Sequence, residues 1–212
     1  GDNIYKTFPN LYTIRGTTHR DVIGWVSSLD KMRSHEPEYI FPSHTKPIIG
    51  TKEAMEALTI YRDAIQYVHD QTIRLMNEGY YPDQIVEMVE LPDSIKSSPY
   101  LSEFYGTVRW SVKSIFNGYL GWFNGNPADL DPLSRKEEAQ KLAKLVGGEE
   151  LLLEALEKSV LDEDMQWALE LSDRLLALDY SVDKVNNLRQ KALLYIGLRS
   201  SNPNKRNYFL SS

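Results

Sequence analysis

The sequence predicts a mostly α-helical protein, in which a small α/β segment over residues 1–50 precedes an all-α domain of helical hairpins over residues 51–212. Three observations predict this fold class. The first 50 residues alternate between strand-like and helix-like patterns, apolar residues then recur at three- and four-residue steps, and very short links join the last helices. The change of pattern near Gly50 predicts a domain boundary.

Residues 1–50 have the pattern of a strand, a helix and a second strand. Asn10–Arg15 alternates in polarity and is rich in β-forming residues, which predicts a strand. Asp21–Arg33 carries an apolar stripe at helical spacing, and Tyr39–Phe41 predicts a second short strand after Pro37 stops the helix. We expect a βαβ-like unit that needs further sheet beside it, because two strands alone are marginally stable.

From Thr51 onward the pattern is helical almost throughout. Thr51 is a plausible N-cap of a long amphipathic helix that Gly79 stops. Pro82–Leu91 predicts a shorter helix with proline in its first turn, and residues 106–120 predict another helix. Residues 92–99 are rich in serine and proline and are predicted to form a loop.

The C-terminal part is predicted to contain four helices. Ser134 and Glu137 have the spacing of a capping box, which opens a helix that Gly147 and Gly148 end. The next three helices are expected at residues 149–161, 164–178 and 182–198. Their short connections favour antiparallel hairpins, although the sequence contains no clean repeat.

The composition excludes several classes of function. A net charge of −6 argues against a nucleic-acid surface, which needs clustered Lys and Arg. The chain has no cysteine, so disulfides, Cys-type zinc sites and thiol nucleophiles are excluded together. No apolar run approaches the roughly 20 residues of a membrane span, and the start of the chain has no signal-peptide pattern. A chain without cysteine survives in oxidising and reducing environments alike, so the compartment stays open, and a periplasmic or secreted location is one alternative for the intact protein.

His44 is the most distinctive candidate metal ligand. It follows the second predicted strand in a proline-punctuated loop, where a rigid strand end would fix the imidazole and leave it accessible. A hydrolytic zinc centre needs at least three ligands of the His, Asp, Glu or Cys type, whereas His19, His35 and His69 are distant in sequence. A hydrogen-bonded loop residue is therefore the simpler interpretation of His44 taken alone.

A second polar group follows the first predicted strand. Arg15, His19 and Arg20 would emerge near His44 if the two strands were parallel, because their carboxyl ends would share one sheet edge. An arginine there can bind a tetrahedral oxyanion such as sulfate or phosphate through two hydrogen bonds. The alternative, which spacing alone favours, is a solvated turn whose charges cap the following helix.

Asn117–Pro127 combines three glycines with three aromatic residues. Glycine weakens helices, so this composition predicts a tight loop beside an aromatic wall. Tyr119 and Trp122 would then either line an apolar pocket or belong to a helix terminus packed into the core, and the sequence favours neither interpretation.

Several of these segments, taken in order, resemble the alkylsulfatase branch of the metallo-β-lactamase superfamily, hydrolases with a two-zinc centre. The matching motifs are Asn10-Leu-Tyr-Thr-Ile-Arg-Gly16, His19-Arg-Asp21, Pro42-Ser-His-Thr-Lys-Pro47 followed by Gly50, Tyr105-Gly-Thr-Val108, Gly121-Trp-Phe-Asn-Gly-Asn-Pro127 and Arg206-Asn-Tyr-Phe-Leu210. The resemblance implies that residues 1–50 are the last part of the metallo-hydrolase domain. It implies that residues 51–212 are the all-helical dimerisation domain of such sulfatases.

The resemblance also implies roles for single residues. His44 matches the last zinc-ligand histidine of the family, and Arg15 matches the arginine that holds the sulfate group. His19 or Arg20 matches a further polar residue near the sulfate. Tyr119 and Trp122 become candidates for aromatic residues that line the substrate pocket.

The chain departs from the family pattern in two respects. The family's H-x-H-x-D-H zinc motif and its acidic zinc ligands match no part of this chain. A His-Asn pair is typical of the family where this chain has Trp110-Ser111. The substrate of the intact protein, an alkyl sulfate or another ester, therefore stays open at this point.

Three functional interpretations follow. We expect a homodimer formed through the helical domain, in an intact protein that uses zinc to hydrolyse a sulfuric ester of the alkyl sulfate class. We expect this chain alone to bind no zinc and to be inactive, because it holds too few ligands. The alternative is a stand-alone helical-repeat adaptor that binds a protein or peptide partner in a groove.

Overall fold

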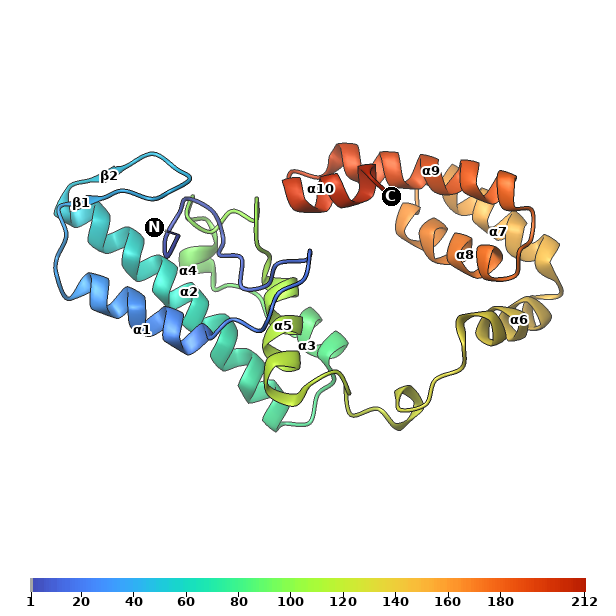
Figure 1. Ribbon diagram of the computed structural model, residues 1–212, viewed down its shortest axis with the longest axis horizontal. Coiled ribbons are helices and arrows are strands. Elements are labelled where there is room, and N and C mark those ends of the chain that lie inside the picture. Colours follow the sequence, from blue (N-terminus) through green and yellow to red (C-terminus); the bar gives the residue numbers. More distant parts are fainter. Residues whose placement is uncertain (1) are drawn as a thin grey trace. The chain divides into compact units, whose positions relative to one another are not determined.

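The structure, a computed structural model, describes residues 2–212. It is mostly helical, as the sequence predicts (Figure 1). The strands of the described chain are β1 (Tyr39–Ile40) and β2 (Ile48–Ile49). The helices are α1 (Val22–Arg33), α2 (Thr51–Asn77), α3 (Pro82–Met88), α4 (Asp93–Lys96), α5 (Val108–Leu120), the 3₁₀ helix η1 (Pro127–Asp129), α6 (Arg135–Val146), α7 (Glu149–Leu161), α8 (Met165–Ala177), α9 (Val182–Arg199) and α10 (Pro203–Leu210).

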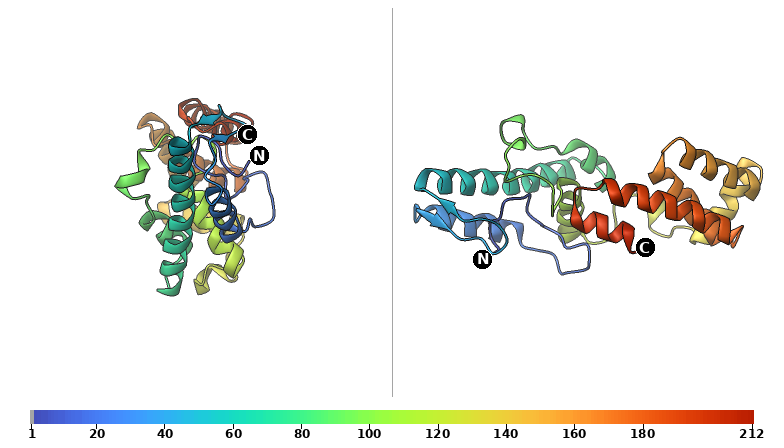
Figure 2. Two further views of the ribbon diagram at one scale, coloured as in Figure 1. Left: turned by 90° about the vertical axis from the view of Figure 1, so that its left-hand side faces the viewer. Right: turned by 90° about the horizontal axis from the view of Figure 1, so that it is seen from above.

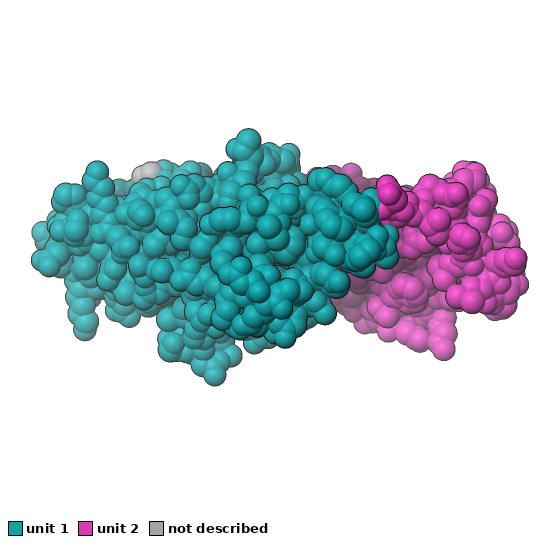
Figure 3. Space-filling model, turned by 90° about the horizontal axis from the view of Figure 1, so that it is seen from below, with its two compact units in different colours: residues 1–130 teal, residues 131–212 magenta. Residues whose placement is uncertain are grey.

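The chain divides into two compact units, residues 1–130 and 131–212, which we call unit 1 and unit 2 (Figure 3). Each unit has its own apolar core. The change of composition near Gly50 is not a boundary between these units, because Ile4, Phe8 and Ile48 pack into the same core as α2. The assignment of residues 1–50 to a metallo-hydrolase domain and of residues 51–212 to a dimerisation domain stays a prediction.

Helix α2 is the central element of unit 1 and runs along its length (Figures 1 and 2). Its apolar face contacts α1, α3, α5 and the β1–β2 hairpin. The helix begins at Thr51 as predicted, but Gly50, with a φ of +109°, occupies the N-cap position that we assigned to Thr51. The side chains that it buries are Ala54, Ala57, Leu58, Tyr61, Ala64, Ile65, Val68, His69, Thr72 and Leu75.

Helix α1 confirms the predicted helix after Asp21. The Asp21 carboxylate accepts a hydrogen bond from the Gly24 backbone N–H at 2.8 Å, which satisfies a free donor of the first turn. Val22, Val26 and Leu29 lie on one face and are buried. This face packs against α2.

The predicted strand over Asn10–Arg15 is wrong, and with it the βαβ-like unit. These residues form an irregular loop, and β1 pairs in antiparallel fashion with β2, so that Tyr39 lies opposite Ile49. Burial alternates only from Leu11 to Ile14, since Leu11 and Thr13 are buried while Tyr12 and Ile14 are partly exposed. Within residues 2–212 no strand pairs with this segment, so alternation produces a loop anchored on a core rather than a strand.

The N-terminal segment is joined by backbone contacts to the segment that precedes α5. The Phe8 N–H donates to the Ser102 carbonyl at 2.8 Å, and the Thr7 hydroxyl donates to the same carbonyl at 2.6 Å. The Gly106 N–H donates to the Phe8 carbonyl at 3.3 Å. These bonds fix the start of the loop that leads to the candidate site.

Unit 2 consists of short-linked helices, as predicted. The predicted capping box is confirmed, because the Ser134 hydroxyl accepts from the Glu137 N–H while the Glu137 carboxylate accepts from the Ser134 N–H. Gly147 ends α6 with a φ of +106°. Helix α10 was not predicted; its N-cap is Asn202, whose side chain accepts from the Lys205 N–H.

No helix within residues 2–212 is both long enough and apolar enough to cross a membrane.

The buried phenols of unit 1 predict a loss of stability at high pH. Burial raises the pKa of Tyr61 well above its ordinary value, and burial also raises the pKa of Tyr5. Both groups thus stay neutral in the folded chain at a pH where unfolded phenols ionise. Below about pH 10 the free energy of unfolding keeps the full contribution of the two neutral phenols. Above about pH 10 it falls with rising pH, by up to about 1.4 kcal/mol per pH unit for each phenol.

This loss is measured as the free energy of unfolding between pH 9 and pH 11.5. We expect a shallower decline in Tyr61→Phe, which removes one titrating phenol. An equally steep decline in this variant would contradict the assignment of the pH dependence to Tyr61.

Candidate functional site

The candidate site is built on the loop of residues 10–20, which Arg20 braces from its end. The Arg20 guanidinium donates to the Asn10 carbonyl at 2.7 Å and to the Thr13 hydroxyl at 3.4 Å. Leu11 and Thr13 are buried and anchor the loop on the core. The loop can therefore present its other side chains toward α5 in a fixed arrangement.

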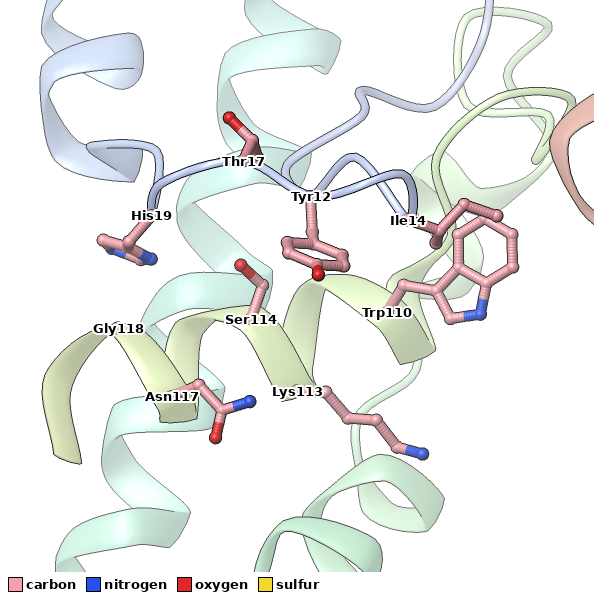
Figure 4. Close-up of a pocket in the computed structure, with 9 residues that line it drawn as sticks. All are labelled: Tyr12, Ile14, Thr17, His19, Trp110, Lys113, Ser114, Asn117 and Gly118. Atoms are coloured by element: carbon pink, nitrogen blue, oxygen red, sulfur yellow. The ribbon is translucent and has the colours of Figure 1, made fainter. Parts of the chain in front are cut away.

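A cavity of about 380 Å³ lies between this loop and α5 (Figure 4). The five lining residues of α5 are spaced at three and four positions, which places them on one helix face. The loop side chains lie over this face, with His19 toward the Gly118 end and Ile14 toward the Trp110 end. The lining residues are Tyr12, Ile14, Thr17, His19, Trp110, Lys113, Ser114, Asn117 and Gly118.

The lining combines two kinds of chemistry. Ile14 and Trp110 supply an apolar wall. The Lys113 ammonium and the Asn117 amide supply hydrogen-bond donors, and the ammonium also supplies positive charge. Such a cavity is suited to a small molecule with an anionic group attached to an apolar chain.

His19 fits against α5 because residue 118 has no side chain. A Cβ atom on Gly118 would lie 2.1 Å from His19 Nδ1, well inside van der Waals contact. The next residue, Tyr119, meets the imidazole edge-to-face, with ring centroids 6.2 Å apart. The structure therefore brings together two of the residues that the sequence singled out, His19 and Tyr119.

Tyr119 is also bonded to a buried histidine of α2. The distance between Tyr119 Oη and His69 Nε2 is 2.8 Å, and His69 Nδ1 lies 2.8 Å from Asp70 Oδ1. These contacts connect α2, the last turn of α5 and the loop around His19.

The other predicted substrate-binding residues lie apart from the cavity lining. Arg15 is exposed in the same loop, and Arg20 is engaged by the loop's own oxygens. Trp122 follows α5, is 74% exposed and contacts the Phe123 ring edge-to-face at 5.7 Å. The Asn117–Pro127 stretch is thus the last turn of α5 and the loop after it. Its residues Tyr119 and Trp122 are exposed, so of the two alternatives the one with a terminus packed into the core does not hold for them.

His44 lies in the connection between β1 and β2. Its side chain is 72% exposed, and its Nε2 lies 3.5 Å from Asp2 Oδ2. The expectation that His44 lies near Arg15 and His19 depended on a strand at Asn10–Arg15 parallel to the one at Tyr39, and Asn10–Arg15 is not a strand. Across residues 2–212 no three His, Asp or Glu side chains gather as a metal site would require, so these residues by themselves do not fit a zinc centre.

Sequence reasoning missed the contribution of α5. Trp110, Lys113 and Ser114 lie about 100 residues after the loop that they face, and only the fold brings the two segments together. Their spacing at helical intervals was visible, but a helix face of mixed polarity does not reveal its partner. The pairing of His69 with Tyr119 was missed for the same reason.

The chain was compared with known proteins. Residues 81–212 match the family described as alkyl sulfatase dimerisation. A linear primary-alkylsulfatase of Pseudomonas sp. (strain ATCC 19151) is 44% identical over 207 residues, which are 97% of this chain and 39% of that protein. The alkyl/aryl-sulfatase BDS1 of Saccharomyces cerevisiae is 30% identical over 95% of this chain and 32% of its own length.

A solved structure is similar over the whole chain. The stereoselective inverting sec-alkylsulfatase Pisa1 from Pseudomonas sp. superimposes with a TM-score of 0.91 and 26% identity, over 99% of this chain and 34% of that one. The chain thus spans about two fifths of the length of the first relative and about a third of the others.

Proposed function

Since the chain belongs to the alkyl sulfatase dimerisation family, we propose that it forms the homodimer interface of a longer hydrolase of alkyl sulfate esters. The observation that carries this proposal is the family match over residues 81–212, which includes α5 and the whole of unit 2. The relatives named as alkylsulfatases extend well beyond the region that they share with this chain, which supports a role as one region of a larger enzyme.

The second copy of the chain would bind an apolar helix face of unit 2. Leu194 and Leu198 lie four residues apart on α9, so they share one face, and they are 52% and 70% exposed. In this proposal another chain covers the two leucines, because removing their side chains from water stabilises the dimer. We therefore place part of the proposed interface on α9.

Leu198→Glu tests this placement. We expect it to weaken self-association at least about tenfold, because a carboxylate would be buried without a partner at the interface. Sedimentation equilibrium of the whole chain measures the change. Because Leu198 is largely exposed, the circular dichroism of the variant should match that of the unchanged chain.

Ser27→Glu is the matched control, since it adds the same charge at an exposed position of α1, outside residues 81–212. This control should dimerise normally. A chain that sediments as a monomer at high concentration would overturn the dimer proposal. Capture of a protein or peptide partner by such a monomer would favour the helical-repeat adaptor instead.

The proposed substrate is an alkyl sulfate. In this proposal the cavity between the loop and α5 holds the ester, with the alkyl chain against Ile14 and Trp110 and the sulfate group toward His19. What supports the proposal is the mixture of apolar and donor groups in the lining. Arg15, Arg20, Tyr119 and Trp122 are the further residues proposed around the sulfate or its chain.

The proposed enzyme uses zinc, and His44 would supply one imidazole ligand. The exposed position of His44 supports this assignment, because the ring is accessible to donors from another part of a longer protein. When bound, zinc would activate the attacking water. We expect no sulfate ester hydrolysis by this chain alone, and activity above that of His44→Ala would overturn this part of the proposal.

A further inference from the structure

We infer that His69 of α2 is a positioning residue for the cavity, because through Tyr119 it holds the His19 imidazole against α5. The inference deepens the proposed function, and only the nature of the ligand rests on that function. The positioning itself rests on contacts among four side chains.

The first contact joins His69 to Asp70. His69 is buried on the face of α2 that also carries Ile65 and Thr72, and its Nδ1 lies 2.8 Å from Asp70 Oδ1. A carboxylate can only accept a hydrogen bond, so Nδ1 carries the hydrogen. The Asp70 carboxylate thus fixes both the orientation of the ring and its tautomer, while its own side chain reaches solvent.

The second contact joins His69 to Tyr119. With the hydrogen of the neutral ring on Nδ1, the Nε2 atom accepts from the Tyr119 hydroxyl at 2.8 Å. If the ring is protonated, Nε2 donates to the same oxygen, so the link is kept in either state. Tyr119 is 53% exposed, and its ring centroid lies 5.7 Å from that of His69, so the hydrogen bond and this ring contact together restrain its side chain.

The third contact joins Tyr119 to His19. Their rings meet edge-to-face with centroids 6.2 Å apart, and the absence of a Cβ at Gly118 leaves room for the imidazole beside the helix. His19 itself lies on an irregular loop and is exposed. The Tyr119 ring is therefore a wall that keeps the imidazole at the cavity.

If His69 only filled the core of unit 1, its hydrogen bonds to Asp70 and Tyr119 would not be needed. The neighbouring positions of α2 that face the core are filled by apolar residues such as Ile65 and Val68. Burial of an imidazole is costly unless both nitrogens are bonded, and here both are. The two bonds lead from solvent-exposed Asp70 to Tyr119 beside the cavity, which supports a role in positioning.

The experiment compares His69→Asn with His69→Gln in the whole chain. In His69→Asn the amide group takes the position of the ring Nδ1, so it can bond Asp70 only. In His69→Gln the longer side chain places the amide group at the position of Nε2, where it can bond Tyr119. Two quantities are measured by NMR: the ring–ring contact between His19 and Tyr119, and the shift of the His19 signals on titration with sodium sulfate.

We expect His69→Asn to lose the ring contact and to weaken sulfate binding about fivefold, the equivalent of one net hydrogen bond. His69→Gln should keep the contact and bind sulfate within about twofold of the unchanged chain. Tyr119→Phe, at an exposed position, should reproduce the effect of His69→Asn and serves as the test if that variant does not fold. The double variant should be no worse than either single one.

A ring contact that persists in both His69→Asn and Tyr119→Phe would overturn the inference. If the His19 signals of the unchanged chain do not respond to sulfate, the proposed ligand is wrong. In that case the ring contact alone decides whether His69 positions His19, so the two failures are distinguishable.

Discussion

Replacing Gly106 by alanine is expected to destabilise unit 1 by about 3 kcal/mol or more. A Cβ atom there would lie 2.0 Å from the Pro9 carbonyl oxygen and 2.8 Å from the Asn10 Cα. These are backbone atoms, so no side-chain rotation can relieve the clash. The neighbouring Phe8 is fully buried, so the segment cannot move away without opening the core.

The loss is measured by amide hydrogen exchange of α2, with α7 to α9 of unit 2 as the internal reference. Gly79→Ala is the matched control, because Gly79 has a φ of +86° and nothing within 4 Å of the added atom. Gly79→Ala should lower the free energy of unfolding by only about 1–2 kcal/mol, because alanine is strained in the left-handed backbone conformation. A Gly106→Ala variant no less stable than this control would show that the two segments can separate cheaply.

The helices were predictable because their signals are local. The capping box of Ser134 acts within one turn and is present as predicted. The Asp21 N-cap is equally local, although only the helix that it starts was predicted. The apolar stripe of α2 is long enough for its period to be unambiguous. Helix α10 lacked such a stripe, since none of its residues is buried, and it was missed.

The prediction of a strand at Asn10–Arg15 was wrong because alternating polarity indicates which side chains are buried and not which backbone groups form hydrogen bonds. Leu11 and Thr13 do point inward, but a strand needs a hydrogen-bonded neighbour, and the Asn10 carbonyl bonds the Arg20 side chain instead. The second strand of the hairpin, Ile48–Ile49, is too short to give a period of its own.

Some residues of the candidate site were predicted from the sequence, but the contacts between them were not. His19 and Tyr119 were singled out by their local patterns and by a family resemblance, neither of which gives the distance between them. Their contact, and the bond from Tyr119 to His69, joins segments 50 and 100 residues apart in the chain, which no local pattern encodes. The hydrogen bonds by which Arg20 braces its own loop were not predicted, and its role beside the sulfate stays a proposal.

Replacing Gly118 by alanine is expected to displace His19 from the cavity and to leave the fold intact. The added Cβ would lie 2.1 Å from Nδ1 and 2.2 Å from Cε1 of His19, which is an exposed side chain that can swing away. Alanine inside α5 should itself stabilise the helix by about 0.5–1 kcal/mol relative to glycine. Stability and site geometry should therefore change in opposite directions.

In the full hydrolase proposed above, this displacement should slow hydrolysis of a short alkyl sulfate about 100-fold, the effect typical of a 1 Å error in a positioned group. In the present chain, the NMR contact between His19 and Tyr119 should disappear while the unfolding midpoint stays level or rises. His19→Ala should be impaired to a similar degree, and the double variant should match His19→Ala, because the clash no longer has a target. Full activity in Gly118→Ala, together with an impaired His19→Ala, would contradict this prediction. It would mean that the whole loop shifts with His19, although Arg20 and Leu11 anchor that loop.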